Sequence, residues 1–289
     1  MDYTITNGTL TVSAETLGAQ LKEIRGAGGA QYLWPGQADI WGDRAPVLFP
    51  YVARLTGGKY TYRGKSYSLP IHGFASGAEF ACEAGEEELR FTLCDTPETR
   101  ACYPFPFRFT VAYRLAGNTL TQEYTVENTG EETMWFGLGA HPGFRVPLEE
   151  GLDFTDYCLE FVPDVSPVRV GFTPQCFLSG EDTPYPLEHG RLPLRHDLFD
   201  QDAIVLRDCG SQVTLRSAKG KRAVKAEFAG IPFLGIWHQP NMAAPYVCIE
   251  PWCSLPSRQD VVEDLETQPT LLSLPAGERY VASVRFTFQ

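Results

Sequence analysis

Alternation of apolar and polar residues is the dominant pattern along the chain, and it predicts β-strands. In FRFTVAYRL, the apolar residues from Phe107 to Leu115 fall on one side of an extended chain, with Arg108 and Arg114 on the other. Gly117-Asn118 follows as a turn, and TLTQEYTVEN then starts a second strand. Together these segments predict an antiparallel β-hairpin.

The same alternation recurs in short segments from one end of the chain to the other. They are KYTYRGKSYSL with a turn at Arg63-Gly64, ELRFTLC, SQVTLRS, RAVKAEFAG and RYVASVRFTF. The 27 glycines and 22 prolines interrupt these segments at short intervals, which favours turns over helices. One segment, RQDVVEDLE (Arg258–Glu266), predicts a helix of about two turns.

The order of these segments disfavours a parallel nucleotide-binding sheet. Strands do not alternate with helices, and neither a GxGxxG pattern nor a P-loop occurs. No internal repeat or long linker divides the chain, and large β architectures often exceed roughly 200 residues as one unit. We therefore predict an all-β fold, one large antiparallel β-sandwich formed by a single domain over residues 1–289.

Charge and composition narrow the classes of partner. A chain of 289 residues with 43% hydrophobic and 21% charged residues is typical of a soluble globular protein. Its net charge of −12 leaves no basic stripe for a phosphate backbone, so no nucleic-acid partner is expected. No apolar run reaches the roughly 18 residues of a membrane span, and the acidity gives no reason to expect an anionic membrane partner.

The cysteines and the first residues predict a cytoplasmic protein. Eight cysteines are spread from Cys82 to Cys253 without a CxxC motif or regular spacing. Met1-Asp2-Tyr3 opens without the basic and apolar regions of a secretory signal. We expect reduced, mostly buried thiols, and no metal at Cys248 and Cys253, because they lack the spacing of zinc ligands.

Four ionisable residues stand out because their neighbours are small or apolar. His141 lies in GLGAHPGF, His72 in LPIHGFA, His238 in GIWHQPN and Glu250 in YVCIEPWCSLP. A buried glutamate is expensive without a partner, and burial raises its pKa towards the range useful for proton transfer. Taken singly, each residue is equally compatible with a structural role, such as a glutamate held by a buried arginine.

The remaining candidates extend this set. Arg54, in LFPYVARLTGG, taken alone is an exposed strand end or an ion-pair partner. His189 and His196 lie in a charged, proline-rich loop and are expected to be solvated. The aromatic residues Phe74, Trp237 and Trp252 accompany the candidate residues. Two histidines, an arginine, a glutamate and aromatic faces together suit a neutral polyol.

An ordered set of motifs resembles the aldose 1-epimerase (galactose mutarotase) superfamily. They are TLGAQLKEI, YLWPG, PVLFPYVARLTGGKYTYRGKSYSLPIHGFA, GLGAHPGF, VCIEPWCSLP and LPAGERYVASVRF, and they span essentially the whole chain. The nearest resemblance is to the mutarotase-like branch found in bacterial sugar operons. The resemblance implies a large antiparallel β-sandwich with a concave sugar-binding face, which agrees with the alternation of the strands.

The resemblance also implies a role for each candidate residue. Glu250 corresponds to the general base and His141 to the general acid. His72 corresponds to the second histidine, which binds and polarises the sugar, and Arg54 to the arginine that positions hydroxyls. An aspartate that holds a sugar hydroxyl corresponds to Asp202 or to Asp200, two residues away. Phe74 and Trp237 are expected to contact the sugar.

These roles predict a hexose mutarotase. It would interconvert α and β anomers of an aldose by opening and closing the hemiacetal ring with an acid and a base. No cofactor and no metal are expected. The partner is a small-molecule sugar, and the protein is expected to be a monomer or weak homodimer. Ser76 stands where this branch often has an arginine, which argues against a phosphorylated sugar.

Three other functions remain open at this stage. A sugar-binding or regulatory protein of the same fold would bind without turnover. A cupin-like metalloenzyme would use His72, His141, His238 and Glu250 as ligands, but the chain has no HxH pair. A glycoside hydrolase would need two cooperating carboxylates, and one strongly placed carboxylate is evident.

Overall fold

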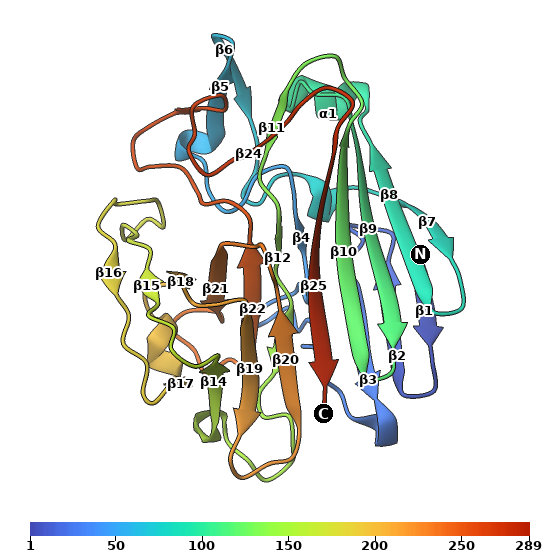
Figure 1. The fold of residues 1–289 in the computed structure, drawn as a ribbon, viewed down its shortest axis with the longest axis vertical. Coiled ribbons are helices and arrows are strands. Elements are labelled where there is room, and N and C mark those ends of the chain that lie inside the picture. The colour runs from blue at the N-terminus through green and yellow to red at the C-terminus, as the bar shows by residue number, and fades with distance from the viewer.

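The structure is a computed structural model that describes all residues from 1 to 289. It consists of 25 strands in five sheets, one α-helix and five short 3₁₀ turns (Figure 1). Nearly every strand pair is antiparallel. The predicted all-β sandwich is confirmed. No helix is both long and apolar enough to cross a membrane.

The largest sheet has nine strands, and its long central strands run side by side in Figure 1. In spatial order the strands are β17 (Arg191–Pro193), β14 (Tyr157–Phe161), β19 (Gln212–Ser217), β20 (Ala223–Glu227), β25 (Arg279–Phe288), β10 (Thr119–Asn128), β9 (Phe107–Ala116), β8 (Glu88–Cys94) and β7 (Ala81–Ala84). The predicted hairpin is β9 and β10, in which Phe109 pairs with Val126.

The second large sheet has eight strands. They are β16 (Thr183–Pro184), β15 (Val168–Arg169), β18 (Ile204–Arg207), β21 (Phe233–Trp237), β22 (Tyr246–Trp252), β12 (Gly139–Ala140) and β4 (Val47–Leu48) in spatial order, with β13 (Gly143–Arg145) also paired to β22. All seven residues of β22 are buried, so this strand is covered on both faces.

Three small sheets and short helical turns complete the fold. One sheet holds β1 (Asp2–Thr6), β2 (Leu10–Glu15) and β3 (Leu21–Gly26), another β11 (Met134–Phe136) and β24 (Leu272–Leu274), and the third β23 (Glu263–Asp264), β5 (Lys59–Tyr62) and β6 (Lys65–Ser68). The helix is α1 (Pro97–Cys102), and the 3₁₀ turns are η1 (Ala27–Gly29), η2 (Thr56–Gly58), η3 (Ala75–Gly77), η4 (Phe154–Asp156) and η5 (His196–Phe199).

The main core includes the inner faces of the two large sheets. Its 67 buried residues come from nearly the whole chain, from Ile5 to Phe288. In β22, Val247 and Ile249 belong to this core, whereas Cys248 and Trp252 belong to smaller apolar clusters. Because side chains alternate along a strand, Glu250 shares the face of Cys248 and Trp252. The glutamate therefore points away from the main core.

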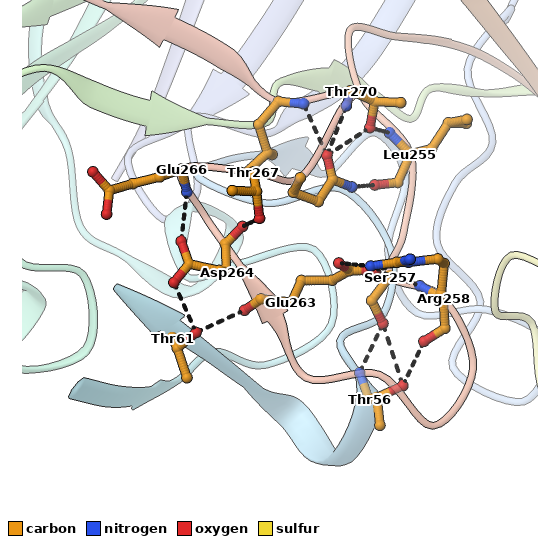
Figure 2. Close-up of polar contacts among 12 residues, drawn as sticks. Thr56, Thr61, Leu255, Ser257, Arg258, Glu263, Asp264, Glu266, Thr267 and Thr270 are labelled. Atoms are coloured by element: carbon orange, nitrogen blue, oxygen red, sulfur yellow. Dashed lines mark hydrogen bonds and ion pairs between the residues drawn. The ribbon is translucent and has the colours of Figure 1, made fainter. Parts of the chain in front are cut away.

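The predicted helix at Arg258–Glu266 is wrong. The segment is an irregular loop that ends in β23, and polar side chains hold it in place (Figure 2). Glu263 accepts hydrogen bonds from the backbone N–H, Nε and Nη2 of Arg258, at 2.9–3.0 Å. These bonds join a side chain to the backbone and the side chain of a residue five positions earlier, and they fix the loop without the i→i−4 bonds of a helix.

The N-terminal side of the same loop is fixed to a distant part of the chain. The backbone N–H of Thr56 donates to Ser257 Oγ at 2.8 Å, and the Thr56 hydroxyl donates to the carbonyl of Arg258 (Figure 2). The backbone N–H of Ser257 donates to the carbonyl of Arg54 at 2.9 Å. The segment that carries Arg54 is therefore tied to the segment that follows β22.

The eight cysteines are all free, but fewer are buried than expected. Cys209, Cys248 and Cys253 are buried, four others are partly buried, and Cys94 is exposed. The prediction of mostly buried thiols is therefore wrong for five of the eight. The reason is position, because Cys94 and Cys158 lie at solvent-facing places in the strands of the nine-stranded sheet, and Cys82 lies on its edge strand β7.

Candidate active site

A cavity of about 280 Å³ lies on the face of the eight-stranded sheet that is turned away from the main core. Its floor includes Glu250 and Trp252 from β22 and Val205 from β18. Its walls come from loops, including residues 41–54, 71–76, 172–176 and 201–203. The cavity thus collects segments from most of the chain length.

Glu250 is the most deeply buried ionisable group in the cavity. Its side chain is 1% exposed, and neither carboxyl oxygen has a hydrogen-bond partner apart from the close approach of His141. Burial, and then the negative charge of Asp202, raise the pKa of Glu250 well above its usual value, while the Trp252 indole opposes the shift. Burial therefore favours the protonated form of this carboxyl group.

His141 lies directly against this glutamate. It follows β12, and its Nε2 is 3.3 Å from Glu250 Oε2, while its Nδ1 has no partner. Burial, and then the neighbouring His72, lower the pKa of His141 to about 3. Burial therefore favours the neutral forms of both groups, a carboxyl group and an imidazole that lie 3.3 Å apart.

The small residues around His141 make room for aromatic rings. A Cβ atom on Gly143 would lie 2.9 Å from Cζ3 of Trp41. The Trp41 ring in turn lies over the His141 imidazole, with ring centroids 5.2 Å apart and an interplanar angle of 32°. The motif GLGAHPGF therefore places the His141 imidazole in the cavity and leaves space beside it for the Trp41 ring.

His72 is held in one tautomer by the backbone N–H of Ala53. Its φ of 64° and the φ of 58° at Ala53 lie in the left-handed region, and the two residues are hydrogen-bonded to each other. The His72 N–H donates to the Ala53 carbonyl at 2.9 Å, and the Ala53 N–H donates to His72 Nδ1 at 3.1 Å. Because Nδ1 is an acceptor, the proton of the neutral ring lies on Nε2.

The environment of His72 keeps that ring neutral. Burial, followed by the positive charge of Arg54, lowers the pKa of His72 to about 4, although Asp202 acts in the opposite direction. The next residue, Gly73, has a φ of 74°, and a Cβ there would lie 2.3 Å from the Phe49 carbonyl oxygen. The glycine is thus required for the backbone to pass Phe49.

Arg54 and Asp202 lie at the cavity, as predicted, and Asp202 rather than Asp200 lines it. Asp202 Oδ1 accepts from the backbone N–H of Ala203 at 2.9 Å, and Oδ2 accepts from the thiol of Cys176 at 3.0 Å. Burial, and then Asp202, raise the pKa of Cys176 to about 11, so the thiol stays a donor. Nothing in the sequence pattern had pointed to Cys176.

Three tryptophans line the cavity. Trp237 and Trp252 belong to the sheet, while Trp41 comes from the loop before β4 and meets Trp237 edge-on at 5.4 Å. Trp41 was missed because it lies outside any alternating segment. A large aromatic residue between the polar residues of QADIWGD was the available signal.

Two of the predicted placements need correction. Phe74 does not line the cavity, since its ring packs against Phe49 and Phe107 at 6.2 and 6.0 Å in the main core. His196 is not solvated, because it stacks on Phe154 at 4.0 Å and its Nδ1 lies 3.0 Å from Nε2 of the buried His238. The polar loop composition did not reveal this contact.

His238 also lies outside the cavity. Its Nδ1 donates to the carbonyl of Gln239 at 2.8 Å, so its hydrogen bonds are made within the fold. The set His72, His141, His238 and Glu250, considered above as metal ligands, is therefore not assembled. A different group, His141, Cys248 and Glu250, has ligand atoms that lie within 4.8 Å of one another.

The fold and the site define a class of protein, a large β-sandwich with a neutral carboxyl–imidazole pair in a tryptophan-lined cavity. The sequence profile of the family described as Aldose 1-epimerase matches residues 1–287. The chain belongs to this family.

Relatives of known sequence or structure cover nearly the whole chain. LacX of Lactococcus lactis subsp. lactis is 33% identical over 279 residues, which are 93% of each protein. The crystal structure of a galactose mutarotase related enzyme from Lactobacillus acidophilus has 37% identity and a TM-score of 0.96, over 100% of this chain and 97% of that one. A galactose mutarotase-like protein from Lactobacillus casei gives 29% identity and a TM-score of 0.95, with 100% of both chains covered.

Proposed function

We propose that the protein is a hexose mutarotase, which interconverts the α and β anomers of an aldose by general acid–base catalysis. The observation that carries this proposal is the buried Glu250 carboxyl group, without another partner, 3.3 Å from His141 Nε2 in a cavity of about 280 Å³. Membership of the aldose 1-epimerase family and its mutarotase-like relatives support the same reaction. The proposal treats residues 1–289 as one functional unit.

When both groups are neutral, the carboxyl proton of Glu250 is sufficient for ring opening. Its transfer from Glu250 to His141 gives a carboxylate and an imidazolium without any exchange with solvent. The carboxylate then removes the O1–H proton while the imidazolium protonates the ring oxygen O5, so that the C1–O5 bond breaks and C1 becomes an aldehyde. O1 and O5 are bonded to the same carbon, so Glu250 and His141, which lie 3.3 Å apart, can act on the two oxygens at the same time.

Ring opening leaves Glu250 protonated and His141 neutral, the state that the free cavity favours. After rotation about C1–C2, the same two groups close the ring on the other face of the aldehyde. The Glu250 carboxyl returns a proton to the new O1, and His141 removes the proton from the O5 hydroxyl as that oxygen attacks C1. The cycle ends with the opposite anomer and the ion pair that began it.

The other cavity residues bind and orient the sugar. The Nε2–H of His72 is available as a donor to an oxygen near the reacting carbon, since Nδ1 is already occupied. Asp202 can accept hydroxyl protons and Arg54 can donate to hydroxyl oxygens. Trp237, with Trp41 and Trp252, offers ring faces to the C–H groups of a pyranose.

A non-catalytic sugar-binding protein of the same fold would need the cavity but not the acid–base pair. The presence of both Glu250 and His141 in contact therefore favours the enzyme. The decisive experiment is an anomer-exchange screen by polarimetry or NMR over free and 6-phosphorylated aldoses, beginning with α-D-glucose and α-D-galactose. Exchange no faster than the spontaneous rate for every sugar would overturn the proposal.

A further inference from the structure

Cys248 is a buried thiol beside the acid–base pair, and the reaction proposed above does not use it. It lies two residues before Glu250 in β22, so both side chains point to the same face of the sheet. It is fully buried beneath the tryptophan-lined side of the cavity, packed near Trp41 and Trp237. The face of one strand thus presents a thiol and a carboxyl group to the same imidazole.

Two of these three groups already have the spacing of metal ligands, and the third lies close to them. In a tetrahedral zinc site with Zn–N and Zn–O bonds of about 2.0–2.1 Å, the two ligand atoms lie about 3.3 Å apart. His141 Nε2 and Glu250 Oε2 are 3.3 Å apart before any metal binds. The Cys248 sulfur lies within 4.8 Å of a ring nitrogen of His141 and of a carboxyl oxygen of Glu250, whereas a Zn–S bond of about 2.3 Å brings the sulfur to about 3.5 Å from the other ligand atoms.

The donor set also suits the charge balance of a buried site. A thiolate and a carboxylate ligand together offset the two positive charges of a divalent cation, and binding requires both groups to be deprotonated. The two Glu250 oxygens, which lack a hydrogen-bond donor from elsewhere in the protein, gain a partner.

We propose that His141, Cys248 and Glu250 form a binding site for a thiophilic divalent cation such as Zn²⁺, and that the bound cation blocks the acid–base pair. Three protein ligands leave a fourth position open towards the cavity. The binding site stands on geometry alone, whereas the blocking effect rests on the proposed mutarotase function. While the metal holds His141 and Glu250, neither group can exchange a proton with a sugar.

Binding is tested with the full chain after treatment with EDTA and removal of the chelator. We expect one equivalent of Zn²⁺ to be retained in equilibrium dialysis, and Cd²⁺ to produce the ultraviolet charge-transfer band of a cadmium–thiolate bond. Cys248→Ser should abolish the band and weaken Zn²⁺ binding by at least about tenfold. Cys94→Ser, which removes an exposed thiol, is the matched control and should keep both signals.

A second ligand variant guards against a folding defect in Cys248→Ser. Glu250→Gln keeps the size of the side chain and the thiol, so we expect the Cd²⁺–thiolate band with weaker affinity. No binding by the wild-type protein, or an unchanged band in a folded Cys248→Ser variant, would overturn the metal site.

The blocking effect has its own readout. Mutarotation by the wild-type protein should fall as Zn²⁺ fills the site and return after EDTA is added. A fully loaded protein with an undiminished rate would refute the block. If the metal-free protein turns over no sugar, the proposed function fails, but the dialysis and cadmium measurements still decide the metal site.

Discussion

Ionisable groups are paired differently on the outer face of the nine-stranded sheet and in the cavity on the eight-stranded sheet. On the outer face, Arg114 pairs with Glu88 at 3.0 Å and with Glu123 at 3.1 Å, all three partly exposed to solvent. In the cavity, Glu250 is 1% exposed and has no hydrogen-bond partner, although His141 Nε2 lies 3.3 Å from its Oε2. Ionisable groups are paired where water would solvate them and left nearly unpaired where it cannot.

The two regions also differ in what their polar groups contribute to stability. Exposed ion pairs contribute about 0–1 kcal/mol each, and their loss is readily compensated by water. An unpaired buried polar group lowers the free energy of unfolding by about 1–3 kcal/mol. A cavity that holds several such groups therefore makes the fold less stable. Natural proteins most often depart from the usual pairing of buried polar groups at functional sites, and in this chain the departures lie in the cavity.

The largest effect is expected from Glu250→Gln. This change removes the group that takes the O1 proton, and general acid–base groups contribute about 10²–10⁴-fold to rate. We expect the mutarotation rate to fall by that factor, as measured by polarimetry, while sugar binding is retained. The matched control is Glu123→Gln on the outer face, with no loss of rate. A Glu250→Gln rate near that of the wild type would refute the assignment.

The second effect is a pH dependence of stability that originates in the cavity. His72 has a pKa of about 4 in the folded protein, below the usual value of 6.5 that applies after unfolding. Between these values the unfolded chain binds more protons, so the free energy of unfolding falls as pH falls through this window. The contribution of His72 to this fall should be roughly 1–3 kcal/mol between pH 7 and pH 4.

Urea unfolding at a series of pH values checks this, with His72→Gln as the variant. The variant lacks the titrating ring, so its stability should fall less steeply from pH 7 to pH 4. His189→Gln, in an exposed loop, is the control and should follow the wild type. Parallel curves for His72→Gln and the wild type would contradict the buried, neutral histidine.

A third effect distinguishes a cavity ring from a core ring. Trp237→Ala should raise KM for the sugar by about tenfold, because aromatic contacts are worth roughly 1 kcal/mol or more. Phe74→Ala should instead lower the free energy of unfolding by about 1–3 kcal/mol and leave KM unchanged at temperatures where the variant is folded. Steady-state kinetics and urea unfolding of both variants measure the four quantities. A raised KM in Phe74→Ala would restore its predicted contact with the sugar.

The smallest effect is expected on the outer face. Arg114→Ala removes both of its ion pairs, yet exposed pairs contribute little, so the free energy of unfolding should change by no more than about 1 kcal/mol. The mutarotation rate should equal that of the wild type. A loss of rate would show that the two faces are coupled.

The same contrast explains what could be predicted from sequence. Alternation predicted β9, β10 and β25 because each strand has buried apolar residues on one face and mostly polar residues on the other. It failed at Arg258–Glu266, where bonds between side chains and the backbone determine an irregular path. A periodic pattern carries no information about such bonds.

For a similar reason, only some of the cavity residues could be predicted from the sequence. Glu250, His141 and His72 stood out because an ionisable group among apolar neighbours is conspicuous in a sequence, and the structure brings them together. Trp41 and Cys176 come from loops whose approach to the cavity depends on the whole fold. Cys248 resembles any apolar residue of a buried strand, and its proximity to His141 appears only in three dimensions.

The tie between Ser257 and the segment Arg54–Thr56 has a consequence for the order in which the molecule folds. It joins positions about 200 residues apart in the chain, whereas the β9–β10 hairpin closes across a single turn. Contacts of such long separation pay the largest loop-closure entropy and form late. During synthesis on the ribosome, the cavity therefore remains incomplete until β22 and the segment beyond it have emerged. The hairpins form first, and the cavity with its acid–base pair forms last.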